Sequence, residues 1–548
     1  MTVSDLTAGR RRLASVNEAL VSAVLVALSL WILARLNDGL FVYFSRYGEA
    51  KVLVWLPFLT CVAFASCFTS VRYATFIPLM RVALRSSAIG LLAYLLLEPP
   101  DFTLANPNAS SAAEYVRLAY FGAILFSALS VSRPAFVIPV AVYISSTRLL
   151  VEEISNLQIS TLDIRYMIDM ALYLSLFGAG GLTIVRLIHP YFPDERRQQE
   201  IAYVAFGLHL GNYFWSGVAK LMIGPHLWTW ILENQTFNTI PYAIVNGTLP
   251  IGHLPWLVQP VFDFMHVIVR PLNLAIVGFQ LFAIVCALRL AWLKLASLFY
   301  DLLHIGIWIL GGLFFWPWVW NNVTILLAAN AQRSPIKPSA KAACILTILL
   351  GMPSVPFYPN LPFYKAAGLG WFDVADARQA YFEAITNDGR RARVPASFFL
   401  GHSYSVSHGY MDTVPHAGHY GHTWWGSAHD YDRLLSSGKC LTPDAVPADT
   451  LERAEQRIER LNKVGNFIRA HHTKMLHWQS WLGSHGYYFS RLYHHPSNPF
   501  LFGPFNALNL GDVVAYNLVV ESVCHRLVRG SPETTVIMRT ETRFDVAR

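Results

Sequence analysis

Four polar side chains that could take part in acid–base chemistry or substrate binding fall within the apolar stretch "HLGNYFWSGVAKL" at residues 209–221. They stand at relative positions 0, 4, 7 and 11, the spacing of one helical face: His209, Tyr213, Ser216 and Lys220. Burial disfavours the ammonium form of a lysine, so a buried lysine can serve as a base. We expect Lys220 to be a catalytic base for an apolar acidic molecule such as a phenol or hydroquinone, with His209 and Tyr213 in the catalytic group and Ser216 binding the substrate. The simpler alternative is that Lys220 extends to the lipid headgroups at the helix end.

The same spacing recurs in "QPVFDFMHVIVRP", whose polar members are Gln259, Asp263, His266 and Arg270. This face predicts either a helix lying in the membrane interface or the rim of a cavity. In the second case Asp263, His266 and Arg270 would bind substrate. The alternative is a structural charge network of Asp263 and Arg270. Pro271 is expected to interrupt the helix.

A third pattern, "LFYDLLHIGIWILGG", places Asp301 and His304 about one helical turn apart. A buried Asp–His pair can relay protons, so both are predicted to assist catalysis. The alternative is a satisfied polar pair between two helices.

Histidines are concentrated in residues 401–432, where His416, His419 and His422 repeat every third residue. Gly and Pro break this stretch into loops, so no helical zinc motif is met, and the composition gives only a weak metal prediction. The alternative is a polar, aromatic surface that caps a membrane cavity or holds a peptide or small aromatic substrate.

The elements that position these residues follow from composition. Of the 548 residues, 54% are hydrophobic and 14% charged, and the mean hydropathy is +0.38, as in integral membrane proteins. The formal charge of +8 does not indicate nucleic-acid binding. The basic residues cluster at the N-terminus and in short loops, as the positive-inside rule requires, rather than in a stripe interleaved with aromatics.

Hydropathy predicts a multi-span α-helical membrane protein of about 9–11 spans over residues 1–360. The candidate spans lie near 18–36, 51–70, 76–98, 115–132, 133–150, 165–189, 199–222, 271–292, 294–313, 313–330 and 342–357. Loop charges place the N-terminus in the cytoplasm. With an odd number of spans, the C-terminal part would then lie on the opposite, extracytoplasmic side of the membrane. One span more or fewer would reverse that side.

Residues 361–548 are ordinary in polarity and predict a soluble domain of mixed α+β structure. Residues 378–400 read as a hairpin turning at "NDG", residues 450–482 as an amphipathic helix, and residues 511–528 as a second helix. Cys440 and Cys524 would be able to pair if this part is extracytoplasmic.

The stretch "YFWSGVAKL" with the following "IGPHLWTW" resembles the lysine-bearing helix of the vitamin K-dependent gamma-carboxylase and of the wider horizontally transferred transmembrane (HTTM) family. The matching residues are Tyr213, Ser216, Gly217, Lys220 and Trp228. The resemblance implies that Lys220 deprotonates a reduced quinone cofactor, that Trp228 contacts the substrate, and that carboxylation or oxygenation follows. It also implies an extracytoplasmic C-terminal domain able to receive a peptide or protein substrate.

The resemblance is to the wider family more than to the carboxylase itself, because the preceding span, "RYMIDMALYLSLF", has no histidine where the carboxylase carries one. Two other classes of function remain open. The chain could be a non-catalytic membrane assembly protein that binds partners through its C-terminal domain, or a transporter whose polar stripes line a path. A transporter would be expected to show internal repeats with broken spans, and none is evident in the sequence.

Overall fold

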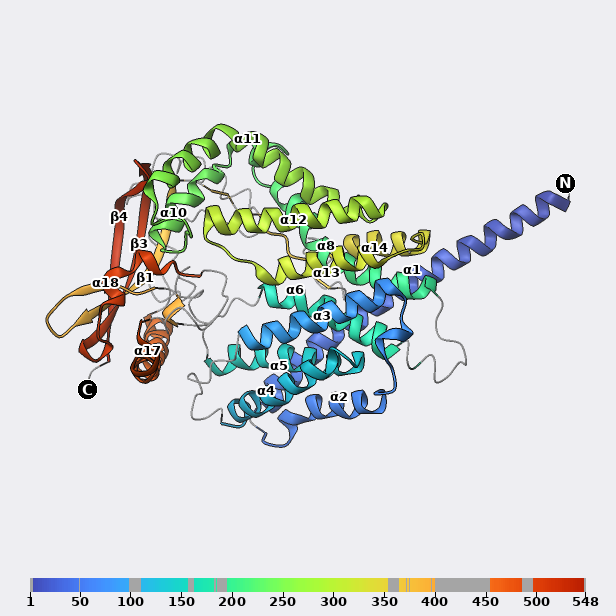
Figure 1. Ribbon diagram of the computed structural model, residues 1–548, viewed down its shortest axis with the longest axis horizontal. Helices are drawn as coiled ribbons and strands as arrows, with labels where there is room; N and C mark the ends of the chain where they lie inside the picture. The colour runs from blue at the N-terminus through green and yellow to red at the C-terminus, as the bar shows by residue number, and fades with distance from the viewer. Residues whose placement is uncertain are drawn as a thin grey trace.

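The computed structural model describes residues 3–48, 50–97, 110–155, 162–181, 184, 195–352, 364–370, 372–373, 375–395, 397–399, 454–484 and 496–546. A large helical part is followed by a four-stranded sheet with one long helix (Figure 1). The first helices are α1 (Val3–Tyr47), α2 (Leu56–Cys67), α3 (Pro78–Leu97), α4 (Ser110–Ser130), α5 (Val137–Ser155), α6 (Leu162–Tyr173) and the π-helical η6 (Leu174–Gly181). They are followed by α8 (Glu195–Leu221), α9 (Thr229–Glu233), α10 (Thr239–Val245), α11 (Pro255–Cys286), α12 (Leu290–Gly311), α13 (Trp316–Ala331) and α14 (Pro338–Leu350).

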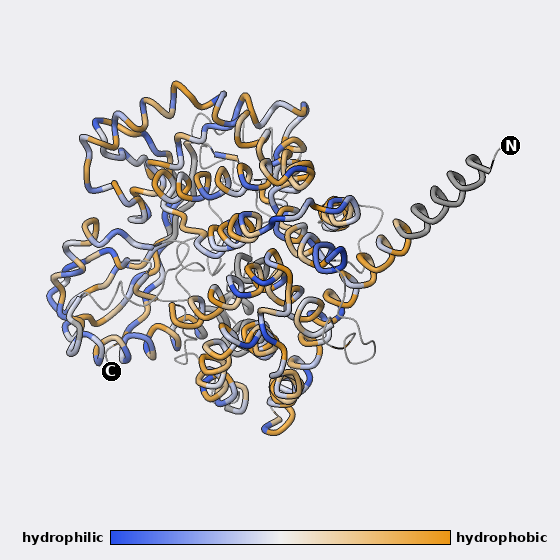
Figure 2. Tube along the Cα trace, turned by 45° about the vertical axis from the view of Figure 1, so that its right-hand side comes forward, coloured by the Kyte–Doolittle hydropathy of each residue, from blue (hydrophilic) through white to orange (hydrophobic). Residues whose placement is uncertain are grey.

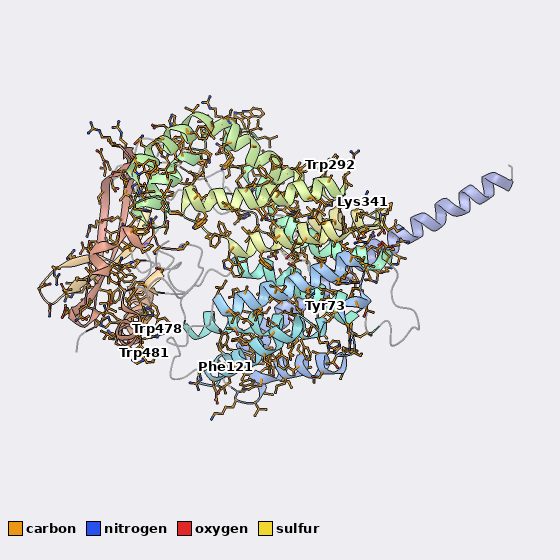
Figure 3. All side chains as sticks on the ribbon, in the orientation of Figure 1. Tyr73, Phe121, Trp292, Lys341, Trp478 and Trp481 are labelled. Carbon is orange, nitrogen blue, oxygen red and sulfur yellow. The ribbon has the colours of Figure 1, made fainter. Side chains whose placement is uncertain are left out.

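Five described helices are long and apolar enough to cross a membrane: Ala19–Tyr47, Pro78–Leu97, Ser111–Ser130, Pro255–Cys286 and Leu290–Gly311. Shorter apolar helices cover Leu53–Cys67, Pro134–Thr147, Ile168–Gly181 and Pro338–Leu350. Large apolar side chains on the outside, such as Phe121 (Figure 3) and Leu28, suit a lipid environment better than water. Figure 2 shows long hydrophobic stretches along these helices and more hydrophilic residues in the sheet. The helical, apolar character that the sequence predicts is confirmed, and the number of spans stays a prediction.

Helix α8 lies at the centre of the helical part, where it contacts α3, α6, α11 and α14. Twenty of its 27 residues are buried, on all sides of the helix. Small residues allow this close packing. A Cβ added at Gly207 would lie 2.7 Å from Thr347 Cβ on α14, and one at Gly217 would lie 3.0 Å from Gln280 Cβ on α11. The polar side chains of α8 are therefore enclosed by neighbouring helices rather than exposed to lipid.

Helix α11 corrects one expectation, because it runs without interruption through Pro260 and Pro271. From the sequence, Pro271 was expected to interrupt the helix that carries Gln259, Asp263, His266 and Arg270. A proline removes one backbone N–H and bends a helix, but neighbouring turns can continue on either side of the bend. In Figure 1, α11 follows an arched path. The predicted interfacial helix and the predicted span 271–292 are thus one element.

The C-terminal part is built on an antiparallel sheet of order β2-β1-β3-β4. Its elements are β1 (Asp376–Thr386), β2 (Arg391–Arg393), α17 (Ala454–Leu482), α18 (Gly503–Asn506), β3 (Val513–Val528) and β4 (Ser531–Asp545). The predicted hairpin is confirmed, with Gly389 at φ +83° in its turn, and so is the long amphipathic helix. Apolar residues of α17, including Phe467 and Ile468, share a core with Phe382 and Tyr516 of the sheet.

The helix predicted over residues 511–528 is wrong, because Val513–Val528 forms β3 between β1 and β4. Valines recur throughout this segment, and β-branched residues favour a pleated strand over a helix. Buried polar groups also occur on it: Glu521 is 2% exposed and accepts a bond of 2.9 Å from Arg539 Nη1 on β4. The Glu521 carboxylate is therefore paired across neighbouring strands.

The sheet is attached to the helical part at the beginning of α11. The β3–β4 turn has positive φ at Arg529 and Gly530, and the Gly530 N–H donates to Gln259 Oε1 over 2.7 Å. Asn498 Nδ2 donates to the carbonyls of Leu249 and Pro250. Cys524 on β3 is disulfide-bonded. Cys440, the expected partner, lies outside the described residues.

Candidate functional site

Lys220 lies near the C-terminal end of α8 and is completely buried. Its Nζ donates to the backbone carbonyl of Leu369 over 2.7 Å and lies 3.4 Å from the carbonyl of Ser216. The ring of Trp230, on α9, lies 5.4 Å from Nζ, within range of a cation–π interaction. Extension to the headgroups, the simpler alternative for this lysine, is not seen. The amine is held inside the protein.

A segment without regular secondary structure, residues 364–370, covers this face of α8. Asn212 Oδ1 accepts from the Ala367 N–H over 2.8 Å, and Ser216 Oγ accepts from the Leu369 N–H over 2.9 Å. Ser216 therefore holds a neighbouring backbone segment, and substrate binding by Ser216, as the sequence predicts, would require this segment to move.

Asp373 is the acidic partner of Lys220 in this site. The carboxyl group is 6% exposed and interacts electrostatically with the lysine. Burial raises the pKa of Asp373 to about 7, while a hydrogen bond from Asn234 and the charge of Lys220 act in the opposite direction. Asn234 Nδ2 donates to Asp373 Oδ2 over 3.3 Å, and Asn273 on α11 donates to the Asn234 carbonyl. An amine and a carboxyl group thus share one apolar, desolvated environment.

A second buried polar cluster begins about three helical turns earlier on α8, at His209. His209 Nε2 donates to Asn322 Oδ1 on α13 over 2.9 Å, and Asn322 Nδ2 donates to the Tyr213 hydroxyl over 2.9 Å. The Tyr213 ring stacks on that of Tyr300 on α12, with centroids 3.8 Å apart and planes 7° from parallel. Asn322 therefore joins two of the predicted catalytic residues.

His304 on α12 completes this cluster. Its Nδ1 lies 2.8 Å from the Tyr300 carbonyl and 3.4 Å from the Tyr213 hydroxyl. A carbonyl oxygen only accepts, so Nδ1 carries the proton and Nε2 is the basic nitrogen of the neutral ring. This arrangement suits a general base whose orientation is fixed by its own helix.

Asp301 is buried beside His304, but no hydrogen bond joins the two side chains within the described part of the chain. Its carboxyl group is 8% exposed and interacts with the Asn322 side chain. Oδ1 has no hydrogen-bond partner among the described residues. Buried carboxyl oxygens without a hydrogen-bond partner are rare in proteins, and those that occur are often found at functional sites.

The structure does not bring the remaining predicted residues to Lys220. Asp263, His266 and Arg270 are exposed on α11, where Asp263 accepts from Gln259 and His266 packs against Phe237. Trp228 is 55% exposed and stacks on His226.

Three contacts of the site were missed by the sequence reasoning. Trp230, not Trp228, faces the lysine, although both occur in "LWTW". Asn322 had a signal, since "NN" is unusual in an apolar span. Asp373 had none, because nothing local indicates that it packs against residue 220.

No group of three or more His, Cys, Asp or Glu side chains able to hold a metal occurs among the described residues. His416, His419 and His422 lie outside them, so the weak metal prediction stays untested.

Comparison with protein-family models, with curated proteins and with solved structures finds no match for this chain. The resemblance to the HTTM family therefore stays a prediction.

Proposed function

We propose that this chain is a membrane-embedded enzyme in which Lys220 acts as a general base on an apolar, weakly acidic molecule such as a phenol or hydroquinone. The observation that carries this proposal is the complete burial of the Lys220 amine between a backbone carbonyl, the face of Trp230 and the Asp373 carboxyl group. Ionisable groups in apolar surroundings are costly, and proteins retain them mainly for function.

The contacts of Lys220 indicate how a proton would move. In the closed arrangement Nζ donates to Leu369 O. A substrate hydroxyl takes the place of that carbonyl when the segment Tyr364–Gly370 moves away from α8. The neutral amine then accepts the hydroxyl proton, and nearby Asp373 stabilises the resulting ammonium. Apolar walls around this site favour an apolar substrate and exclude water.

The cluster of His209, Tyr213 and His304 has a supporting role in this proposal. Seven residues separate Tyr213 from Lys220, which corresponds to about 10 Å along the helix. A molecule of one or two fused rings lying along α8 would contact both clusters. His304, oriented through Nδ1, and Asp301 are the groups available to exchange a second proton.

The resemblance to the HTTM family extends this proposal to a reduced quinone as the cofactor and to carboxylation or oxygenation as the chemistry. In this extension the Lys220 amine would take the proton of an aromatic diol, and the stacked rings of Tyr213 and Tyr300 would pack against the edge of its ring. The cofactor would supply the acidic hydroxyl. About 9–11 spans, a cytoplasmic N-terminus and an extracytoplasmic C-terminal part, in an inner or plasma membrane if the source is bacterial, belong to the same proposal. The disulfide at Cys524 supports an oxidising side for that part.

A non-catalytic assembly protein is the second candidate, and one observation favours it. Asn212, Ser216 and Lys220 all bond the backbone of the segment Tyr364–Gly370. A purely structural lysine that attaches this segment to α8 would make the same contact. In that case binding of a partner through the C-terminal part is the function.

Turnover of a reduced naphthoquinone under oxygen, with and without bicarbonate, tests the first candidate. Wild type, Lys220→Met and Lys365→Met are purified in detergent, and quinone products are followed by chromatography and mass spectrometry. Lys365 is an exposed lysine of the same segment and serves as the matched control. We expect Lys220→Met to lose about 10²–10⁴-fold in rate while keeping its melting temperature, and Lys365→Met to behave as wild type.

A melting temperature lowered only in Lys220→Met, with no turnover in wild type, would contradict the enzyme and favour the structural lysine. If the chain is an assembly protein, deletion of residues 401–432 should abolish partner capture. If it is an enzyme, Lys220→Met should abolish turnover and leave any partner capture unchanged.

A further inference from the structure

A pocket of about 560 Å³ lies at the opposite end of α8 from Lys220, between α1, α8 and α14. Its walls differ in character. Residues of α1 and α14, including Val26 and Leu346, form an apolar side, and Arg196, Lys337 and Ser339 form a polar, basic end. A space with an apolar side and a cationic end has the chemistry of a site for an amphiphilic anion.

Ser22 gives an independent indication of a ligand. This residue lines the pocket from α1, is 6% exposed, and its Oγ has no hydrogen-bond partner among the described residues. Buried hydroxyl groups in proteins are nearly always bonded. A ligand oxygen in the pocket would supply the missing partner.

The basic end combines a helix N-terminus with charged side chains. Helix α14 begins at Pro338, and its N-cap residue Lys337 forms no side-chain cap. The first turn of a helix attracts anions through its N–H groups and dipole. Lys337 is exposed and adds a full positive charge. Arg196 donates to Glu200 and to Ser339 Oγ, and Glu200 also bonds Ser339 and Arg197. Glu200 therefore offsets the charge of these arginines, and Lys337 is the cation that a ligand would meet.

The position along the helices fits a lipid. The long apolar stretch Ala19–Tyr47 of α1 begins at this pocket. Arg196, in the first turn of α8, and Lys337, just before α14, line this pocket. Both belong to basic stretches of the sequence, "DERRQQ" and "QRSPIKPSAK", and basic stretches between spans favour the cytoplasmic side of a membrane. Figure 1 shows α1 and α14 side by side here, and their contact is close. A headgroup of the inner leaflet would meet the basic end.

We propose that this pocket binds an anionic phospholipid. The phosphate lies against Lys337, Ser339 and the N-terminus of α14. An ester or glycerol oxygen bonds Ser22 Oγ, and one acyl chain follows the apolar side formed by α1 and α14. This site is separate from the proposed catalytic cluster and does not depend on it.

Thermal unfolding of the full-length protein in detergent, titrated with single lipids, tests the site. The probes are phosphatidylglycerol, phosphatidylcholine and inorganic phosphate. The variants are Lys337→Gln, Ser22→Ala and the control Lys365→Gln, an exposed lysine elsewhere. We expect phosphatidylglycerol, and neither of the other two, to raise the melting temperature. Lys337→Gln should raise the lipid concentration needed for half-saturation about fivefold. Ser22→Ala should raise it to a smaller extent, and Lys365→Gln should leave it unchanged.

Three results would overturn the proposal. Equal stabilisation by phosphatidylcholine would show a site without charge selection. Full stabilisation by inorganic phosphate would show an anion site without a lipid. Indistinguishable titrations of Lys337→Gln and Lys365→Gln would place the lipid elsewhere. If Ser22→Ala is poorly folded, Ser22→Thr, which keeps the hydroxyl and fills part of the pocket, replaces it and is expected to compete with lipid binding.

Discussion

Two helical stripes in this protein share one spacing and have opposite environments. His209, Tyr213, Ser216 and Lys220 on α8 are all buried, three of them at 2% exposure or less. The equivalent positions on α11 are occupied by Gln259, Asp263, His266 and Arg270, and the last three are exposed. On α8 the polar groups bond α13, α12 and the segment Tyr364–Gly370, whereas on α11 they bond mainly one another or the β3–β4 turn.

The difference shows what spacing can and cannot predict. Periodicity places side chains on one face of a helix. What that face contacts depends on how closely other helices approach. Glycines on α8 let α14 and α11 come within van der Waals contact of its backbone. Gly278, on α11, has no atom within 4 Å of its added Cβ. Small residues beside a polar stripe were therefore the better guide to burial.

Gly207→Ala should have the largest effect on this packing. The new methyl group would lie 2.7 Å from Thr347 Cβ and 2.9 Å from the Cys344 carbonyl oxygen, and a backbone atom cannot yield easily. We expect a loss of about 2–3 kcal/mol in the free energy of unfolding, measured by denaturant titration in mixed micelles. Gly278→Ala is the control and should be neutral or stabilising by up to about 1 kcal/mol. Equal effects of the two substitutions would contradict the close packing of α8.

Asn322→Leu tests whether the buried stripe depends on its polar contacts. The substitution keeps the approximate size of the side chain but leaves His209 Nε2 without its partner. Leaving a buried polar group unsatisfied costs about 2 kcal/mol, so the same unfolding measurement should show a clear loss. A stability equal to wild type would mean that water or another group replaces the amide.

His525, one of the buried histidines of the C-terminal part, gives a pH-dependent prediction. Desolvation and the charge of Arg393 lower the pKa of His525 to about 4, below the value of about 6.5 in an unfolded chain. Between these values the unfolded state binds more protons, so stability is lost as the pH falls from about 6.5 to 4, by about 1.4 kcal/mol per pH unit.

His525→Gln should remove this component, and the difference between the two pH profiles is the quantity to measure. His266→Gln, an exposed histidine of the α11 stripe, serves as the control. Parallel profiles for wild type and His525→Gln would show that His525 is protonated in the folded state as readily as in the unfolded state.

Arg270→Gln should have the smallest effect, because its side chain is exposed on α11. We expect a change within about 0.5 kcal/mol in stability and no change in turnover. A substantial loss of turnover would bring the α11 stripe into the active site, which is the cavity-rim alternative of the sequence analysis, and would remove the contrast between the two stripes.

The sequence predicted elements whose pattern is local. The hairpin at "NDG" and the amphipathic α17 each carry their own periodicity, and both are confirmed. Strand β3 was wrongly predicted as a helix because its burial depends on pairing with β1 and β4. Strand β1 lies about 140 positions earlier in the sequence, and β4 follows β3 after a short turn. Pro271 was expected to end a helix, but the surrounding apolar residues continue α11 across it.

The sequence placed residues of the candidate site on single helices and could not show which helices meet. His209, Tyr213, Ser216 and Lys220 do share one buried face. The partners Asn322, Trp230 and Asp373 come from other elements, and their proximity to α8 follows from tertiary packing that no local rule contains. Asp301 and His304 were correctly expected to be buried, although no bond between them is found.

The most direct test of the central claim is mass spectrometry of the small molecules that co-purify with the detergent-solubilised protein. Wild type, Lys220→Met and the control Lys365→Met are extracted and compared. We expect a quinone or phenolic lipid bound to wild type and to Lys365→Met, with its amount or redox state changed in Lys220→Met. If all three proteins carry the same bulk phospholipids and no aromatic lipid, Lys220 is a structural contact of the segment Tyr364–Gly370 and the enzyme proposal is wrong.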